Sequence, residues 1–443
     1  MRKGFCTLLA VAFALLGGAA TQAADRHEGV ATCGGSTCHG RQVADPKTHV
    51  RQTELLTWQD ESSIGGAHSR AWRVLTQPRA QAIAARLGIG RAETSAECIG
   101  CHGDAAVNRG ERFVVSDGVG CEACHGGSQR WLASHTRIGV GHRANVAAGM
   151  IPLDDVTVRA NVCLDCHFGS NKPGQFVTHR IMAAGHPRIA FELDLFTALQ
   201  KHHDEDRDYR ERGKAIAGGV KTWAVGQALA LDRSLTLFQS RGLSGAIAEN
   251  YFFDCRSCHR SFSDAPNARL GVEANPQRPV PPGAAVFNDE NLIMLGAAAR
   301  AVDPAMASRL DSQSRAFHIA LGGDRAGALR AAAALASTAR GIAARFAGAS
   351  FAGSQTAAML RDVLAGVAAS AYTDYQGGAQ AVMAADTLIT AMAADGQLSA
   401  GAARGARGDL DRAYAAVRDA NAYRSGEFRA AMGRIAGTVG VGR

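Results

Sequence analysis

The chain contains five cysteine pairs, and each pair is followed directly by a histidine. Two residues separate the cysteines in four of the pairs, and four residues separate them in the first. This pattern is the attachment signature of c-type haem, in which two thiols bond to the porphyrin and the histidine becomes the proximal iron ligand. The sequence therefore predicts a chain that folds around five large apolar groups and that moves electrons.

The haem-binding residues follow from the motifs. The proximal iron ligands are predicted to be His39, His102, His125, His167 and His259. The thiols that would attach the five haems are those of Cys33, Cys38, Cys98, Cys101, Cys121, Cys124, Cys163, Cys166, Cys255 and Cys258.

Other uses of cysteine pairs fit the pattern less well. A redox-active pair has no need of a following histidine. Structural zinc would take the pairs two at a time, which leaves one pair over and the histidines unexplained. A disulfide between Cys33 and Cys38 stays open as an alternative, because this motif has the longer loop. Gly34 and Gly35 would equally allow that loop to bulge around a haem.

The first 24 residues have the pattern of a secretory signal peptide. Arg2 and Lys3 precede an apolar run over residues 8–16, and cleavage is predicted after Ala23 or Ala24. Cys6 would leave with the signal, so every cysteine of the mature chain belongs to a haem motif. No later stretch is apolar and long enough to span a membrane. We therefore expect a soluble protein exported to the periplasm, because c-type haem is attached outside the cytoplasm.

The basic composition does not indicate a nucleic-acid partner. The formal net charge is +8 before removal of the signal. Each haem adds two propionates, so the reduced holoprotein would carry about −4 and the oxidised one about +1. Some of the arginines and lysines are therefore expected to pair with propionates.

The composition divides the mature chain into three parts. Residues 25–262 hold all the motifs and are predicted to form a haem-packed domain with sparse, short helices and many glycine turns. Residues 263–287 are a Pro-rich connection. Residues 288–443 are Ala-rich and predict a helical bundle or hairpin array, with helices beginning after Asp324 and covering residues 354–371 and 380–393. The predicted fold class is mainly α.

The second axial ligand of each iron decides between a closed electron-transfer haem and an open one that can bind a substrate. Beyond the proximal set, the histidines are His27, His49, His68, His135, His142, His179, His186, His202, His203 and His318. His186 precedes a proline, which disfavours helical geometry, so His179 and His186 are expected to serve different haems. The side chains of adjacent His202 and His203 point in different directions, so at most one is expected to bind iron. Methionine ranks below histidine as a candidate.

Residues 33–170 resemble the tetrahaem cytochrome c-554 family of ammonia oxidisers and its multihaem relatives. The resemblance is carried by the motif ending at His39, by Ala-His68-Ser-Arg-Ala, and by Gly-Val-Gly-Cys121-Glu-Ala-Cys124-His125-Gly. His135 and the motif ending at His167 follow in the same order and spacing. The longer first motif, the fifth motif and the helical tail depart from the tetrahaem pattern, so the resemblance does not extend to a particular redox partner.

The resemblance implies distal ligands for three of the irons. His135 would bind the iron of His39, and His68 would bind the iron of His167. The iron of His125 would take a later histidine, for which His179, His186 and His203 are the candidates. The iron of His102 would be five-coordinate and open, although His49, His186 or His203 could also close it.

Three functions are consistent with the sequence. The first is an electron carrier that works between redox proteins such as a dehydrogenase, other cytochromes or a membrane quinone complex. The second is a multihaem oxidoreductase that converts a small nitrogen or sulfur compound at the open haem of His102. The third is a subunit that docks to a partner through residues 288–443, which is compatible with the first.

Overall fold

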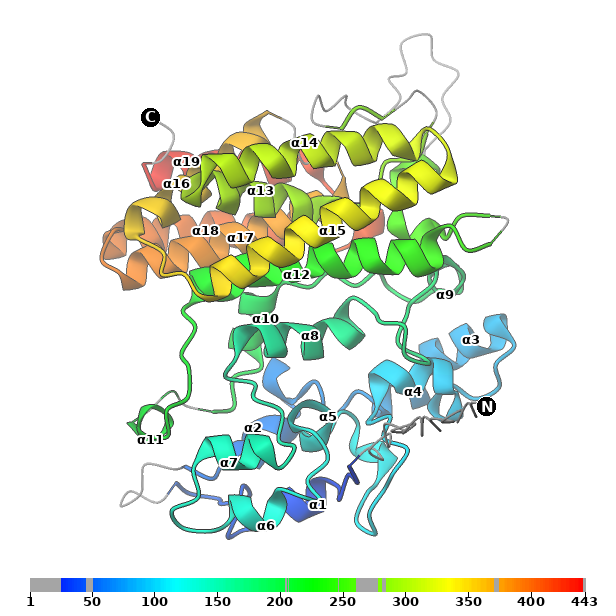
Figure 1. Ribbon diagram of the computed structural model, residues 1–443, viewed down its shortest axis with the longest axis vertical. Coiled ribbons are helices and arrows are strands. Elements are labelled where there is room, and N and C mark those ends of the chain that lie inside the picture. Colours follow the sequence, from blue (N-terminus) through cyan, green and yellow to red (C-terminus); the bar gives the residue numbers. More distant parts are fainter. Residues whose placement is uncertain are drawn as a thin grey trace, which may run out of the picture.

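The computed structural model describes residues 25–44, 51–203, 205, 207–245, 247–259, 278–280, 284–369 and 374–440. Short helices and turns form one half of the molecule, and long helices form the other (Figure 1). Two isolated backbone bridges, His27 with Arg109 and Phe253 with Phe287, are the only β pairing among the described residues. The mainly α fold class is confirmed.

The half that carries the haem motifs is built from helices of four to twelve residues. They are α1 (Val30–Cys33), α2 (Glu54–Gln59), α3 (Pro78–Leu87), α4 (Ala96–His102), α5 (Cys121–His125), α6 (Leu132–His135), α7 (His142–Ala147), α8 (Val156–His167), α9 (His179–Ala183), α10 (Leu193–Leu199) and α11 (Arg207–Glu211). Single 3₁₀ turns lie at Ile64–Gly66, Arg73–Thr76, Ala92–Thr94, Val115–Asp117, Asn250–Phe252 and Cys255–Ser257. The predicted short helices and glycine turns are present. Eleven described glycines from Gly29 to Gly213 have positive φ.

Long helices form the other half. They are α12 (Gly219–Leu237) with a π-helical end at Phe238–Gly242, α13 (Glu290–Val302), α14 (Pro304–Leu321), α15 (Arg325–Ala347), α16 (Gly353–Ala368), α17 (Tyr375–Ala394), α18 (Ala400–Ala416) and α19 (Ser425–Thr438), with a 3₁₀ turn at Ala420–Ala422. Alanine and leucine favour these helices, and their apolar faces share one core. None of the described helices combines the length and the apolar character needed to cross a lipid bilayer.

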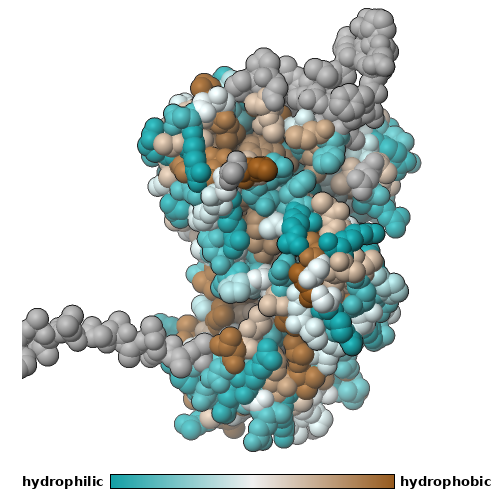
Figure 2. Space-filling view, turned by 90° about the vertical axis from the view of Figure 1, so that its right-hand side faces the viewer, coloured by the Kyte–Doolittle hydropathy of each residue, from teal (hydrophilic) through white to brown (hydrophobic). Residues whose placement is uncertain are grey.

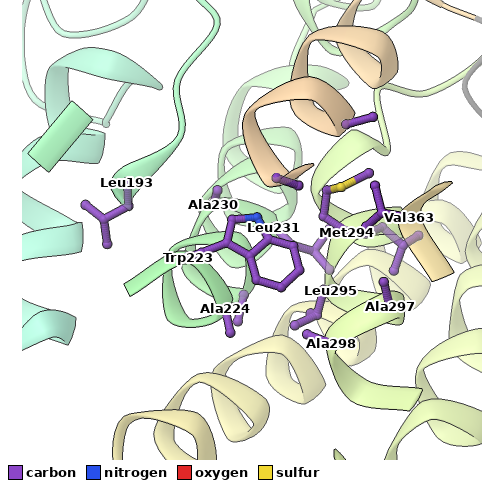
Figure 3. Packing of buried hydrophobic residues seen from close by; sticks show 14 of the residues in the cluster. Leu193, Trp223, Ala224, Ala230, Leu231, Met294, Leu295, Ala297, Ala298 and Val363 are labelled. Carbon is purple, nitrogen blue, oxygen red and sulfur yellow. The ribbon is translucent and has the colours of Figure 1, made fainter. Parts of the chain in front are cut away.

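Helix α12 joins the two halves. Fourteen of its nineteen residues are buried, including every residue from Thr222 to Leu231. It packs against α15, α13 and α17 on the bundle side and against α8 and α10 on the motif side. Trp223 of α12 lies fully buried between Leu193 of the motif half and Leu295 of α13 (Figure 3). One core cluster therefore runs from Val156 to Val439, across the sequence position where the composition changes.

The first third of the described chain has very little apolar core of its own. Before residue 156 the buried apolar side chains are Leu75, Ala84, Leu87, Ala92 and Trp131. Nine of the ten large apolar side chains that are exposed in the described chain lie before residue 260. Figure 2 shows apolar side chains at the surface of this half, between hydrophilic ones. So few buried residues cannot stabilise a segment of this length. The apolar surface of bound haems would supply the missing core of this half.

The helical predictions for the C-terminal region are confirmed with shifted ends. Helix α15 begins directly after Asp324, whose side chain accepts a hydrogen bond from the Gly327 amide at 2.7 Å. The helix predicted over residues 354–371 is α16, and the one over 380–393 lies within α17. The predicted signal peptide and most of the Pro-rich connection lie outside the described residues.

We expect Asp324→Ala to lower the free energy of unfolding by about 1 kcal/mol, because the amide of Gly327 loses its capping acceptor. Denaturant unfolding followed by circular dichroism measures this change. Arg361→Gln on the exposed side of α16 is the control and should stay within about 0.5 kcal/mol of the parent. An equal loss in both variants would contradict the capping role.

Candidate haem sites

Most of the cysteine-pair motifs lie in a helical turn. Helix α4 ends at His102, α5 consists of the motif that ends at His125, and α8 ends at His167. A helical turn places cysteines three residues apart on one face and puts the histidine at the end of the same turn. The fifth motif begins in the 3₁₀ turn Cys255–Ser257, and the first begins at Cys33, the last residue of α1. None of the ten motif cysteines forms a disulfide in the structure.

Each of the five motif histidines has the ring of another histidine beside it. His39 lies 5.9 Å from His135, measured between ring centres, and the two rings are nearly parallel. His68 lies 6.0 Å from His167, and His186 lies 6.3 Å from His102. His125 lies 5.8 Å from His203, and His259 lies 6.2 Å from His179.

These separations fit two imidazoles bound to one metal ion. A metal–imidazole bond is about 2 Å long, so two rings on opposite sides of an ion have centres about 6 Å apart. All five pairs lie close to this value, and each joins a motif histidine to a histidine from a distant part of the chain. The donor set of two thiols and two imidazoles per motif therefore fits c-type haem with two axial histidines.

Burial keeps most of these rings in the neutral form that binds metal. It lowers the pKa of His167 to about 4, with further lowering by His68 and His102. The pKa of His135 is likewise lowered by burial to about 4, and that of His125 lies well below its usual range. The imidazoles of His167, His135 and His125 are therefore neutral at pH 7 and available to bind a metal.

Hydrogen bonds orient several of the rings through Nδ1. The carboxylate of Glu54 lies 2.9 Å from Nδ1 of His39, and this hydrogen bond raises the pKa of that imidazole despite its burial. Nδ1 of His102 lies 3.0 Å from the Ala71 carbonyl oxygen, and Nδ1 of His186 lies 2.7 Å from the Pro187 carbonyl oxygen. An occupied Nδ1 leaves Nε2 of the same ring available to a metal.

His125 has two histidines within reach. The ring centres of His202 and His203 lie 6.4 and 5.8 Å from that of His125, and one nitrogen of each of the three rings lies within 4.8 Å of the others. Nδ1 of His202 is 2.8 Å from the Gln200 carbonyl oxygen. Nδ1 of His203 is 3.5 Å from the carboxylate of Glu54. His202 is not among the candidates that the resemblance implied for the iron of His125, and its position beside His125 is a finding of the structure.

The motifs also lie close to one another in pairs. The thiols of Cys33 and Cys121 share a hydrogen bond, which raises the pKa of Cys33. The Cys166 thiol lies 3.6 Å from the Gly100 carbonyl oxygen, and the Cys101 thiol lies 3.9 Å from the Cys166 carbonyl oxygen. The first motif is therefore next to the third, and the second is next to the fourth.

The other described histidines are engaged elsewhere. Nδ1 of His27 lies 2.7 Å from Asp104, and Nε2 of His142 lies 2.9 Å from Asp154. His318 is fully buried in the helical bundle. His49 lies outside the described residues.

At the second motif, the arrangement of histidines differs from what the family resemblance implied. The resemblance implied an open position opposite His102, and the structure brings the ring of His186 there. His179 and His186 lie beside different motif histidines. His179 begins α9 whereas His186 follows its end, as the proline after His186 predicts.

Residues 32–126 match the family model described as cytochrome c554 and c-prime. No curated protein and no solved structure matches the chain. The matched segment holds the first three motifs as well as His68, and a c-type cytochrome carries covalently bound haem in electron transfer. Over residues 32–126, which hold its first three cysteine-pair motifs, the chain resembles the cytochrome c554 family of c-type cytochromes.

Proposed function

We propose that the chain is a five-haem electron carrier of the periplasm in which every iron has two axial histidines. The observation that carries this proposal is the set of five histidine pairs with ring centres 5.8 to 6.3 Å apart. The proposed pairs are His39 with His135, His102 with His186, His125 with His203, His167 with His68 and His259 with His179.

A haem iron held by two imidazoles changes its oxidation state without offering a position to a substrate. The protein's own residues support that role by fixing the rings. Carbonyl oxygens accept from Nδ1 of His102 and His186, and a carboxylate accepts from Nδ1 of His39. The contacts between Cys33 and Cys121, and between Cys101 and Cys166, would bring haems into neighbouring pairs suited to the passage of single electrons.

An oxidoreductase would need one open iron. Among the described residues, each motif histidine has a second imidazole at ligand distance, including His102, where the open position was implied. The closed arrangement therefore favours the carrier. A substrate role for a small nitrogen or sulfur compound would require His186 to leave His102.

Export is part of the proposal because the thiols of all five motifs are used in haem attachment, which takes place outside the cytoplasm. The partners would be redox proteins, such as a dehydrogenase, another cytochrome or a membrane quinone complex. The contact with them would be made where a haem edge approaches the surface, on the motif half of the molecule.

The number of haems is tested by mass spectrometry and pyridine haemochrome assay of the purified holoprotein. We expect five haems per chain, and four in the Cys33→Ser/Cys38→Ser double variant. The first motif is the informative one because its loop is longer. Four haems in the unaltered protein, with a disulfide between Cys33 and Cys38, would contradict the five-haem proposal.

A further inference from the structure

Two haem sites meet at a single carboxylate. Glu54 is the first residue of α2, and its side chain is 15 % exposed. One of its oxygens lies 2.9 Å from Nδ1 of His39, and the other lies 3.5 Å from Nδ1 of His203. His39 belongs to the first motif, and His203 lies beside His125 of the third. Glu54 therefore touches the far side of two imidazoles that face different irons.

We propose that Glu54 is a positioning residue that couples the first and third haem sites and lowers the reduction potential of both. This inference rests on the five-haem function proposed above. A carboxylate that accepts a hydrogen bond from a metal-bound imidazole fixes the ring and makes its other nitrogen a stronger electron donor. Stronger donation stabilises ferric iron relative to ferrous iron.

Electrostatics acts in the same direction at both sites. Oxidation adds one positive charge to a haem, and a nearby partly buried negative charge favours that state. A single imidazole, that of His39 or that of His203, would separate Glu54 from each of the two irons. In the second motif, by contrast, Nδ1 of His102 faces the neutral carbonyl oxygen of Ala71. The first and third haems are therefore the pair that Glu54 holds at lower potential.

The same contact selects His203 over His202 opposite His125. Nδ1 of His202 faces a neutral carbonyl oxygen, whereas Nδ1 of His203 faces the carboxylate. The carboxylate makes His203 the more basic imidazole. The His203 ring centre is also closer to that of His125, at 5.8 against 6.4 Å.

The experiment is a spectroelectrochemical titration of the holoproteins of the parent, Glu54→Gln and Glu54→Asp, each with its haem content and EPR spectrum. We expect Glu54→Gln to raise two of the five midpoint potentials. Each shift should amount to at least a tenfold change in the ratio of oxidised to reduced haem, which is about 59 mV for a one-electron couple. Glu54→Asp keeps the charge and should restore part of both shifts.

Asp154→Asn is the matched control, because Asp154 is bonded to His142, which lies beside no motif histidine. It should leave all five potentials unchanged. Five unchanged potentials in Glu54→Gln, with all haems retained, would overturn the inference. If Glu54→Gln loses haem, Glu54→Ala, which also removes the carboxylate, carries the test: a rise of two potentials supports the inference and five unchanged potentials overturn it. A failure of the five-haem function itself would already be visible in the parent protein as a lower haem count or a high-spin signal.

Discussion

Replacing His186 with alanine is expected to convert one iron of the holoprotein from low spin to high spin. The ring of His186 lies 6.3 Å from that of His102, with Nδ1 held by the Pro187 carbonyl oxygen and Nε2 left available. Alanine has no donor to replace it, so the iron of His102 would lose its sixth ligand. The high-spin EPR signal should account for about one haem in five, and the reduced variant should bind carbon monoxide.

His142→Ala is the control for this change. His142 is also a partly buried histidine of the motif half, but its ring faces Asp154 and not a motif histidine. This variant should stay low spin throughout and should not bind carbon monoxide. If the parent protein already has an open, high-spin iron, and His186→Ala does not change that signal, the pairing of His102 with His186 is refuted.

Asp289→Asn is expected to lower the free energy of unfolding by about 3–5 kcal/mol, because it leaves a buried guanidinium without its main counter-charge. Asp289 and Arg278 form a two-point ion pair in which both side chains are less than 5 % exposed. Asp374 lies 3.4 Å from the same guanidinium, and Nε2 of His318 lies 3.2 Å from Asp289. Denaturant unfolding of the bundle measures the loss.

Glu427→Gln removes one partner of an exposed ion pair at the start of α19, in which Glu427 lies 3.0 Å from Arg424. Because such surface pairs contribute at most about 1 kcal/mol, this variant should be close to the parent. If Asp289→Asn and Glu427→Gln lower the free energy of unfolding by similar amounts, burial does not make the Arg278–Asp289 ion pair stronger than an exposed one.

The contribution of Asp289 should depend on pH in a defined direction. Burial alone would raise the pKa of this carboxyl, but the charges and hydrogen bonds of Arg278 and His318 together outweigh burial and hold the pKa below its ordinary value of 3.8. A carboxyl whose pKa is lower in the folded than in the unfolded state stabilises the protein. This stabilisation is fully present above the unfolded-state pKa and is lost as the pH falls through the folded-state pKa. The difference between parent and Asp289→Asn should therefore be constant from about pH 7 to 5 and shrink below about pH 4. A difference that grows on acidification would contradict the sign.

The local parts of this structure could be predicted from the sequence. The five motifs follow from spacing alone, and the C-terminal helices follow from their alanine and leucine content together with caps such as Asp324. Pro187 indicated that His186 leaves the helix that carries His179. Each of these signals operates over a few residues.

The long-range parts could not be predicted in the same way. His186 meets His102, and Glu54 meets both His39 and His203, across separations that no periodicity encodes. Glu54 had no signal in the sequence, since an isolated glutamate is most often a solvated side chain. Helix α12 precedes the Pro-rich connection, yet it packs in the same core as the helices that follow it, because its apolar residues between Val220 and Leu237 are buried against both halves.

The most direct test of the closed-iron account is a low-temperature EPR spectrum of the fully oxidised holoprotein, with the haem content measured on the same sample. The account predicts five haems per chain and low-spin signals only, since each motif histidine has a second imidazole 5.8 to 6.3 Å away. A high-spin signal equal to one haem in five would contradict it, and would assign the chain an open iron at which a substrate binds.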